Sequence, residues 1–321
     1  MAITGAASYV STTQEFLNHW MAVDAALGAQ PLVLEQNIGL AAFAASRASL
    51  LTARDQVQDA ALDQVLARGA LNMKKEWLLP RLNLFKEKVL AALGSSVYAR
   101  ALPLIPGITE GEEAFSRPLI QAAKLWKKIN AAPPAGFPAP LMLLDDTTEA
   151  IFSTAVADLA GLYEDVTDAE QDVTIALEHR NDIQDRLYDL MKNYRQTVPT
   201  RIAAGHALLD TLPALSPTSN RTPDAVVASG SVDAATQEAV ITFTPSTDAD
   251  LAGYDLRMTP GDTYDTNIDT VVASLTPGET PQFRTAQGLE SPGAVASYKV
   301  YVRLTTGGEA GSHAVTLTRA A

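Results

Sequence analysis

The stretch that decides the fold of the C-terminal third reads GLESPGAVASYKVYVRLTTGGEAGS and covers residues 288–312. Apolar and polar side chains alternate along its centre, between turn signals at Pro292-Gly293 and Gly307-Gly308. A period of two is typical of a β-strand with one buried face. The alternation therefore predicts an inward set and an outward set. The inward set is Tyr298, Val300, Val302 and Leu304, and the outward set, our candidate interaction surface, is Lys299, Tyr301 and Arg303.

Short alternating runs of the same kind surround this strand. The seven predicted strands are residues 225–228, 239–244, 254–258, 270–274, 282–285, 297–305 and 314–318. Seven short strands in about 100 residues predict an antiparallel β-sandwich. The segment SPTSNRTP before them has the composition of a linker. We therefore predict three parts: a helical part over 1–217, a linker over 218–223 and a sandwich over 224–321.

Several motifs of the sandwich resemble those of fibronectin type III domains, over about residues 222–320. The pattern Leu289-x-x-Pro292-Gly293 followed by Tyr298-x-Val300-x-Val302-x-Leu304 looks like that family's E-to-F corner and F strand. Gly311-Ser312 lies where the family's last strand usually begins, and the segment from Thr247 to Arg257 resembles the loop entering its third strand. Phe243 departs from the tryptophan that the family commonly carries. The resemblance implies a spacing or binding role without implying one partner.

The helical part contains a long heptad pattern. From Asp146 to Val198 there is no proline and only one glycine, and Pro199 is expected to end the helix. Seam residues recur there at alternating spacings of three and four, apart from one extra four at the beginning, which is typical of a helix packed along another helix. The seam consists of Ile151, Ala155, Leu159, Leu162, Val166, Ala169, Val173, Ala176, Arg180, Ile183, Leu187, Leu190 and Tyr194. A helix of this length extends roughly 80 Å, so it must lie along a second long helix or a partner.

A second long helix is predicted from about Gln36 to Leu79, where Pro80 should kink or break it. A shift of 109 positions brings it into register with the first, for example Phe43 with Phe152 and Phe85 with Tyr194. We interpret residues 12–107 and 115–217 as a divergent tandem duplication. Each repeat would have a short helix ending in a Trp-containing turn, a proline-rich connector, a long helix and a shorter return helix. Together the repeats predict an elongated antiparallel helical bundle.

The composition gives no indication of catalysis or of a cofactor. The chain has no cysteine, which excludes disulfides, zinc–thiolate sites and thiol chemistry. The four histidines, at positions 19, 179, 206 and 313, contain no pair at metal-ligand spacing on one helix. A Gly-x-Ser-x-Gly elbow and a glycine-rich phosphate loop are also absent from the sequence. We therefore expect no catalytic residue, no cofactor and no enzyme activity.

The charge of the chain limits its partners and location. Lys and Arg number 24 against 37 Asp and Glu, and a net charge of −13 disfavours nucleic acid and anionic lipid surfaces. The N-terminus lacks the basic and apolar regions of a secretory signal. The longest weakly polar run, Ile38 to Leu51, contains Arg47 and is too short to span a bilayer. The prediction is a cytoplasmic protein, or one associated with a surface, virion or appendage by a non-standard route.

Acidic residues form the remaining candidate sites. Asp248, Asp250 and Asp255 lie in or near a sandwich loop rich in oxygen ligands, which suits calcium. Turn formation by Asp explains the same residues without an ion and is the preferred interpretation. The acidic run between Glu164 and Asp172 is expected to be a solvated helix face. Arg180, the one charge on the seam, is expected to pair with an acidic residue.

The leading functional hypothesis is a non-enzymatic structural or interaction protein. In it the bundle assembles with copies of itself or with another protein, and the sandwich is displayed as a spacer or binding module. A second hypothesis is a glycan or cell-surface binding protein that uses the sandwich to recognise its target. A third is a helical membrane-active protein, against which the weak apolarity of the helices argues. An enzyme ranks last.

Overall fold

The computed structural model describes residues 3, 6–94, 96–134, 137, 140–216 and 221–320. These residues form two compact units. One unit comprises Met1–Leu62 with Val173–Ala321, and the other comprises Asp63–Asp172. Both divisions fall inside long helices, so each unit takes one part of each helix. Of the predicted linker at 218–223, residues 218–220 lie outside the described residues.

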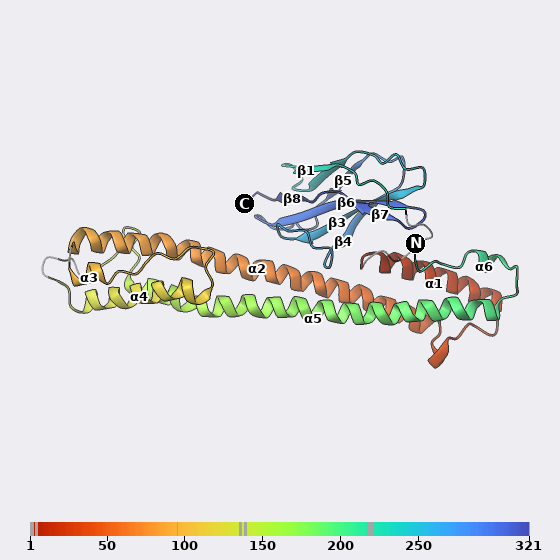
Figure 1. Cartoon of the computed structure of the whole chain (residues 1–321), viewed down its shortest axis with the longest axis horizontal. Coiled ribbons are helices and arrows are strands. Elements are labelled where there is room, and N and C mark those ends of the chain that lie inside the picture. Colours follow the sequence, from red (N-terminus) through yellow and green to blue (C-terminus); the bar gives the residue numbers. More distant parts are fainter. Residues whose placement is uncertain are drawn as a thin grey trace. The chain divides into compact units, whose positions relative to one another are not determined.

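The helical part consists mainly of two long helices. They are α2 (Leu40–Leu93, 54 residues) and α5 (Glu149–Arg201, 53 residues). In each unit a stretch of α2 lies beside a stretch of α5 (Figure 1). At about 1.5 Å per residue, each helix is roughly 80 Å long. The predicted pairing of two long helices is therefore present, although their predicted ends at Leu79 and Val198 are wrong: both helices continue through a proline.

The side chain of Arg81, the residue after Pro80, contacts neighbouring parts of the structure where α2 continues through the proline. A proline removes one backbone donor and pushes away the preceding turn, which leaves carbonyls without partners. The Arg81 guanidinium donates to the carbonyl of Trp77 over 2.8 Å and stacks on the Trp77 ring at 3.7 Å. An ion pair of 2.7 Å with Asp145 holds the same guanidinium. In α5, Pro199 lies in the last turn, where Ile202 N–H still donates to the carbonyl of Val198 over 3.1 Å.

The start of α2 also differs from the prediction. Residues Glu35–Asn37 form a turn of 3₁₀ helix, in which Gln36 and Asn37 have positive φ angles of 60° and 61°. A β-bridge between Leu34 and Ile38 closes this turn. The α-helix therefore begins at Leu40, four residues after the predicted start.

The Asp63–Asp172 unit has a core built around Trp126. This residue lies within α4 (Glu112–Ala131) and is fully buried. Its ring stacks on Phe85 of α2 at 4.9 Å and contacts Phe152 of α5 at 5.7 Å. The indole N–H donates to the carbonyl of Leu141 over 3.1 Å, so the one polar atom of the ring is satisfied.

The helical core of the other unit is built in the same way around Trp20 of α1 (Ser8–Leu27). The Trp20 ring contacts Phe43 of α2 at 5.5 Å and Tyr194 of α5 at 4.8 Å. His19 bonds the Tyr194 hydroxyl over 2.6 Å and the Leu208 carbonyl over 2.8 Å. Residues matched by the shift of 109 thus take corresponding places beside a tryptophan.

Two details of the predicted helical repeat are wrong. Trp20 and Trp126 lie inside α1 and α4 instead of in turns at their ends. The expected return helices are single turns, α3 (Val97–Arg100) and α6 (Ala207–Asp210). In the first repeat the reason is that α2 continues to Leu93, so most residues assigned to the return helix belong to the long helix itself. In the second repeat α5 ends at Arg201, three residues after its predicted end, and the segment that follows forms the single turn α6.

The C-terminal part is an antiparallel β-sandwich (Figure 1). One sheet has the order β1-β2-β5, and the other has the order β4-β3-β6-β7 with β8 also paired to β6. The strands are β1 (Ala228–Val232), β2 (Ala239–Phe243), β3 (Leu251–Pro260), β4 (Thr270–Leu275), β5 (Gln282–Thr285), β6 (Val295–Leu304), β7 (Glu309–Gly311) and β8 (Val315–Thr318). Each predicted strand overlaps an observed one, but β1 begins only at Ala228 and β7 was not predicted.

The inward set of β6 is confirmed by burial. Tyr298, Val300 and Val302 are completely buried, and Leu304 is nearly so. The Tyr298 hydroxyl donates to the carbonyl of Gln287 over 2.6 Å, which ties the strand to the turn before it. Because side chains alternate along paired strands, the residues between these positions form the outer face of the larger sheet.

Candidate functional site: an arginine-lined pocket

The outer face of the larger sheet carries a cluster of charged side chains. Asp255 and Arg257 of β3 lie opposite Tyr301 and Lys299 of β6 in the register of the two strands. Arg257 is only 5% exposed, although it is a charged residue on the face away from the sandwich core. A buried charge of this kind is expensive unless it is paired and hydrogen-bonded.

Arg257 obtains its partners from neighbouring strands. Its two terminal nitrogens donate to both carboxylate oxygens of Glu309 on β7, over 3.2 and 2.6 Å. The guanidinium lies 3.9 Å from the centre of the Tyr301 ring, and Asp269 is 4.0 Å away. Burial by itself lowers the pKa of Arg257, but the hydrogen bonds and negative charge of Glu309 outweigh it and raise the pKa. Arg257 therefore remains positively charged.

For the Asp269 carboxyl group, the effect of burial on the pKa exceeds that of its hydrogen-bond and charge partners. Burial raises the pKa of its carboxyl group, even though the Tyr264 hydroxyl donates to it over 2.7 Å and Arg257 is nearby. Burial also raises the pKa of Tyr264, so this phenol remains a donor. The ammonium group of Lys299 lies 4.7 Å from the centre of the Tyr264 ring. These contacts join the loop before β4 to the outer face of β6.

A second ion pair completes the cluster. Arg303 of β6 lies 2.9 Å from a carboxylate oxygen of Asp255, and the Ser274 hydroxyl of β4 donates to the same carboxylate over 2.7 Å. The pairs Arg257–Glu309 and Arg303–Asp255 both border a pocket. Its open volume is about 380 Å³, within the range that small-molecule sites occupy.

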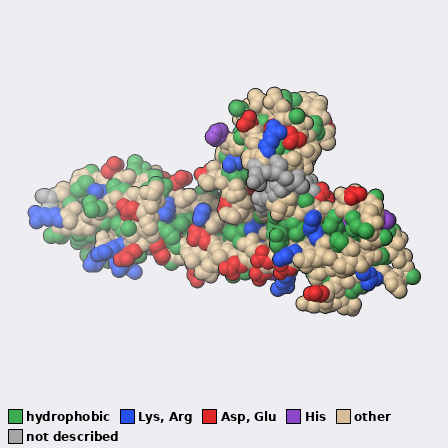
Figure 2. Space-filling view, turned by 45° about the vertical axis from the view of Figure 1, so that its right-hand side comes forward, with side chains coloured by type: hydrophobic (Ala, Val, Ile, Leu, Met, Phe, Trp, Pro, Cys, Tyr) green, Lys and Arg blue, Asp and Glu red, His purple; other side chains and the backbone are tan. Residues whose placement is uncertain are grey.

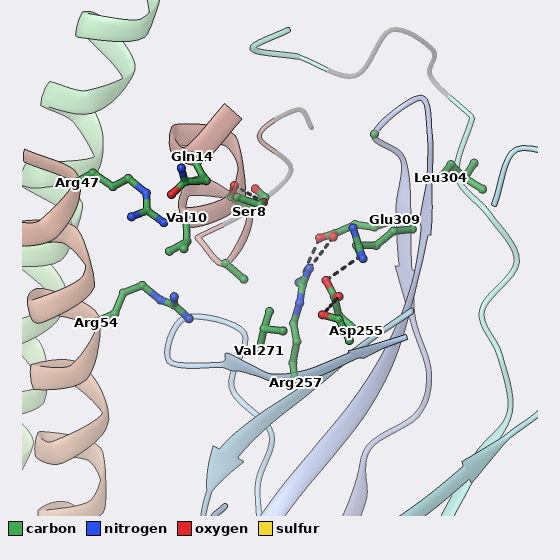
Figure 3. Close-up of a pocket in the computed structure, with 15 residues that line it drawn as sticks. Ser8, Val10, Gln14, Arg47, Arg54, Asp255, Arg257, Val271, Leu304 and Glu309 are labelled. Carbon is green, nitrogen blue, oxygen red and sulfur yellow. Dashed lines mark hydrogen bonds and ion pairs between the residues drawn. The ribbon is translucent and has the colours of Figure 1, made fainter. Parts of the chain in front are cut away.

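Within the same unit, α1 and α2 form the other wall of this pocket (Figure 3). Ser8, Val10 and Gln14 come from α1, and Arg47 and Arg54 come from α2. Both α2 arginines extend toward the pocket. Four arginines therefore line it, against the carboxylates of Asp255 and Glu309.

The predicted outward set lies on the outer face of the sheet as expected. Its side chains, however, contact other side chains of the sandwich. Tyr301 is buried under Arg257, and Lys299 rests on Tyr264. Arg303 is held by Asp255. Of the three, Arg303 lines the charged pocket, and its other three arginines, Arg47, Arg54 and Arg257, were not selected from the sequence.

The three aspartates considered for calcium are not brought together. Asp248 and Asp250 both pair with Arg221, whereas Asp255 pairs with Arg303. Among the described residues no group of three or more His, Asp or Glu side chains is arranged to hold a metal ion. The acidic run from Glu164 to Asp172 is exposed as expected, and Glu170 pairs with Arg68 over 2.8 Å.

Arg180 is buried on the seam, but the partner expected for it is wrong. Its guanidinium donates to the backbone carbonyl of Asn267 and to the side chain of Asn181, the latter over 2.8 Å, in place of a carboxylate. Burial lowers its pKa, and so does the positive charge of Arg54. Asp265 and Asp269 act in the other direction. Sequence periodicity could not indicate this partner, because the carbonyl lies 87 residues away in a sandwich loop.

A second hollow lies within the Asp63–Asp172 unit and is mostly apolar. It has a volume of about 780 Å³. We call it the α2–α5 groove, lined by Ala70, Met73, Lys74, Trp77, Ala150, Ile151, Thr154, Ala155, Asp158 and Leu162. Met73 and Ile151 are 72% and 50% exposed. Lys74 and Asp158 form an ion pair of 2.8 Å between its two walls, which leaves the lining without net charge. Hydrophobic side chains are visible among charged ones along the helices in Figure 2.

Ile151 was predicted on the buried seam and is instead half exposed. It lies in the first turn of α5, where Phe152 at the next position makes the contact with Trp126. In the described part of the chain, no helix has a run apolar and long enough to cross a membrane.

No family model and no curated protein matches this sequence. Some solved structures share a partial likeness. Pectate lyase PelI from Erwinia chrysanthemi, in complex with tetragalacturonic acid, is 19% identical over 29% of this chain and 28% of its own, with a TM-score of 0.25. Pectate lyase Pel3 from Pectobacterium carotovorum is 13% identical over 30% and 28%, with a TM-score of 0.24. The Clostridium perfringens spore cortex lytic enzyme SleM is 15% identical over 32% of both chains, with a TM-score of 0.24.

The chain thus spans about a third or less of the length of these enzymes. Likenesses of this size carry no argument about its fold or activity.

Proposed function

We propose that the protein is a non-enzymatic structural or interaction subunit that assembles with copies of itself through the α2–α5 groove. The observation that carries this proposal is the exposure of Met73 and Ile151 on facing walls of one apolar hollow. Large apolar side chains scattered singly are normal on a surface, but a contiguous apolar hollow marks an interaction site.

The spacing along α2 favours a helix as the occupant. Leu66, Ala70, Met73 and Trp77 follow one another at intervals of four, three and four residues. This is the heptad spacing with which one helix receives the side chains of another. Leu66 is 61% exposed, so the apolar stripe continues beyond the groove along α2.

Charge favours a second copy of the same chain. The protein carries a net charge of −13, so two copies repel over most of their surfaces. In the groove the ion pair of Lys74 with Asp158 cancels both charges. The groove itself therefore adds no net charge to the repulsion between copies, and a two-fold arrangement would place Met73 and Ile151 of each copy in the groove of the other.

Two further proposals concern the architecture. The sandwich is a fibronectin type III-like module, supported by the arrangement of three strands against four or five and by the bond from the Tyr298 hydroxyl to the Gln287 carbonyl. The helical part is a tandem duplication, supported by the matching environments of Trp20 and Trp126. Neither feature implies catalysis, which is consistent with a structural role.

The assembly is tested by replacing both exposed side chains, as Met73→Asp with Ile151→Asp, in the full chain. Met73 and Ile151 are 72% and 50% exposed, so burying both removes from water the equivalent of about 1.2 fully exposed side chains per copy. A two-fold pair would bury about 2.4. At ~2 kcal/mol for each full burial, their loss amounts to ~5 kcal/mol, or more than a thousandfold in the dissociation constant.

The readout is the oligomeric state by light scattering and negative-stain microscopy over a range of concentrations. Ile175→Asp is the matched control, since Ile175 is 61% exposed on α5 and lies outside the groove. We expect the control to assemble like the original protein and the double variant to be monomeric. A strict monomer for the original protein at high concentration would refute the proposal.

A further inference from the structure

Two arginines of α2 present positive charge to the pocket, and no ion pair of either is found among the described residues. Arg47 and Arg54 are seven residues apart, two helical turns, and therefore lie on one face of α2. Figure 3 shows both side chains extending from α2 toward the pocket. The Arg47 Nε is buried and has no hydrogen-bond partner among the described residues. The negative charges that act on Arg54 are those of Asp269 and Asp55.

The carboxylates in the pocket are already engaged by other arginines. Glu309 accepts both hydrogen bonds from Arg257, and Asp255 pairs with Arg303. The lining thus holds four arginines against two carboxylates, and both carboxylates are engaged by Arg257 and Arg303. This occurs in a chain whose net charge is −13. Burial disfavours the charged form of Arg54 and lowers its pKa, an effect larger than the opposing effect of Asp269 and Asp55.

We propose that this pocket binds a doubly charged tetrahedral oxyanion group, phosphate or sulfate, between Arg47 and Arg54. Guanidinium groups suit such an anion because their planar donors bond two oxygens at once. Two negative charges would balance the positive charges of Arg47 and Arg54. The inference concerns a different site from the proposed assembly groove and does not depend on it.

The size of the pocket indicates that the anion is attached to a small organic molecule. A volume of about 380 Å³ is several times larger than one tetrahedral ion needs, since a water molecule takes up only about 30 Å³. Val10, Val271 and Leu304 provide an apolar side to the lining. The ligand class is therefore a phosphate or sulfate ester with a compact organic part.

The test measures binding to the full chain by calorimetry and by the thermal unfolding midpoint at low salt. Inorganic phosphate, glucose 6-phosphate and glucose are the three probes. We expect glucose 6-phosphate at a hundred times its Kd to raise the midpoint by roughly 5 °C. Inorganic phosphate should bind more weakly and glucose not at all. In Arg47→Gln with Arg54→Gln, the affinity for the ester should fall by at least about tenfold.

Two controls separate loss of the site from loss of the fold. Arg117→Gln removes an exposed arginine of the other unit and should bind the ester normally. Without ligand, the double variant should melt at the same temperature as the original protein or higher, because two positive charges of the pocket lining are gone. If it fails to fold, Arg47→Gln alone provides the same comparison.

A midpoint shift that is absent, or that survives in the arginine variants, would overturn the proposal. Equal affinity for inorganic phosphate and the ester would overturn the assignment of an organic ligand. Neither result would affect the proposed assembly, which is tested separately with variants of the α2–α5 groove.

Discussion

Replacing Glu309 by glutamine tests whether its ion pair with Arg257 stabilises the larger sheet. The side chain of Glu309 is 16% exposed and that of Arg257 is 6% exposed, so the ion pair is largely removed from water. Removing one partner of a buried pair leaves an uncompensated charge and costs about 3–5 kcal/mol. Asp269 remains 4.0 Å from Arg257 and can compensate in part, so we expect the lower end, ~3 kcal/mol.

The double variant Arg257→Met with Glu309→Gln should recover most of this loss. Methionine fills part of the space of the arginine without a charge, and replacing both members of a buried pair by less polar groups is often close to neutral. The expected order of stability is therefore the original protein, the double variant and then Glu309→Gln. Asp233→Asn serves as a control, because the pair of Asp233 with Arg284 is exposed and its removal should change stability little.

Hydrogen exchange of the amides of β3, β6 and β7 is the suitable assay. All three tryptophans, at positions 20, 77 and 126, lie in helices, so tryptophan fluorescence does not report on the sandwich. A loss of ~3 kcal/mol speeds exchange through opening of the sheet by more than a hundredfold. A change below ~1 kcal/mol for Glu309→Gln, or a double variant as unstable as the single one, would refute the reasoning.

Two further predictions concern the cores and the pH dependence. Phe43→Ala and Phe152→Ala should each lower the free energy of unfolding by about 3–5 kcal/mol, because both rings are fully buried against a tryptophan. Hydrogen exchange should increase in the unit that holds the substitution, and an equal increase around both tryptophans would contradict two separate cores. For Asp269, burial raises the folded-state pKa above the unfolded value of about 3.9. Its stabilising contribution is therefore complete below about pH 4 and is lost as the pH rises through the folded-state pKa. Denaturant titrations of Asp269→Asn should show the variant gaining stability relative to the original protein between pH 4 and pH 7, and a trend in the opposite direction would show that Arg257 stabilises the carboxylate more than burial disfavours it.

Local patterns predicted the strands because each strand is specified by its own residues. The run from Gln282 to Thr285 coincides with β5, and the alternation around Val300 predicts which side chains of β6 are buried. The prediction failed where a helix continues past a residue that usually ends it. Pro80 interrupts the helix pattern in the sequence, but α2 continues through it, and the Arg81 side chain there bonds the Trp77 carbonyl and pairs with Asp145.

The candidate sites depended on tertiary structure to different degrees. In the α2–α5 groove, the apolar spacing of Leu66, Met73 and Trp77 is present in the sequence, but only the structure shows that Met73 stays exposed. In the arginine-lined pocket, the sequence contains one signal, the single charge of Arg47 within the weakly polar run from Ile38 to Leu51. Nothing in that run indicates what the charge faces.

By itself, the sequence determined the kinds of elements in this protein: two long heptad helices, an alternating-strand sandwich and an acidic chain without cysteine. These properties follow from the periodicity and chemistry of neighbouring residues, which act over a few positions of the chain. The tertiary structure alone decided which charges face each other, since Arg54 and Arg257 are more than 200 residues apart and line one pocket. The electrostatic energy of a charge depends on its burial and on its nearest partners in space, and neither is encoded by sequence spacing.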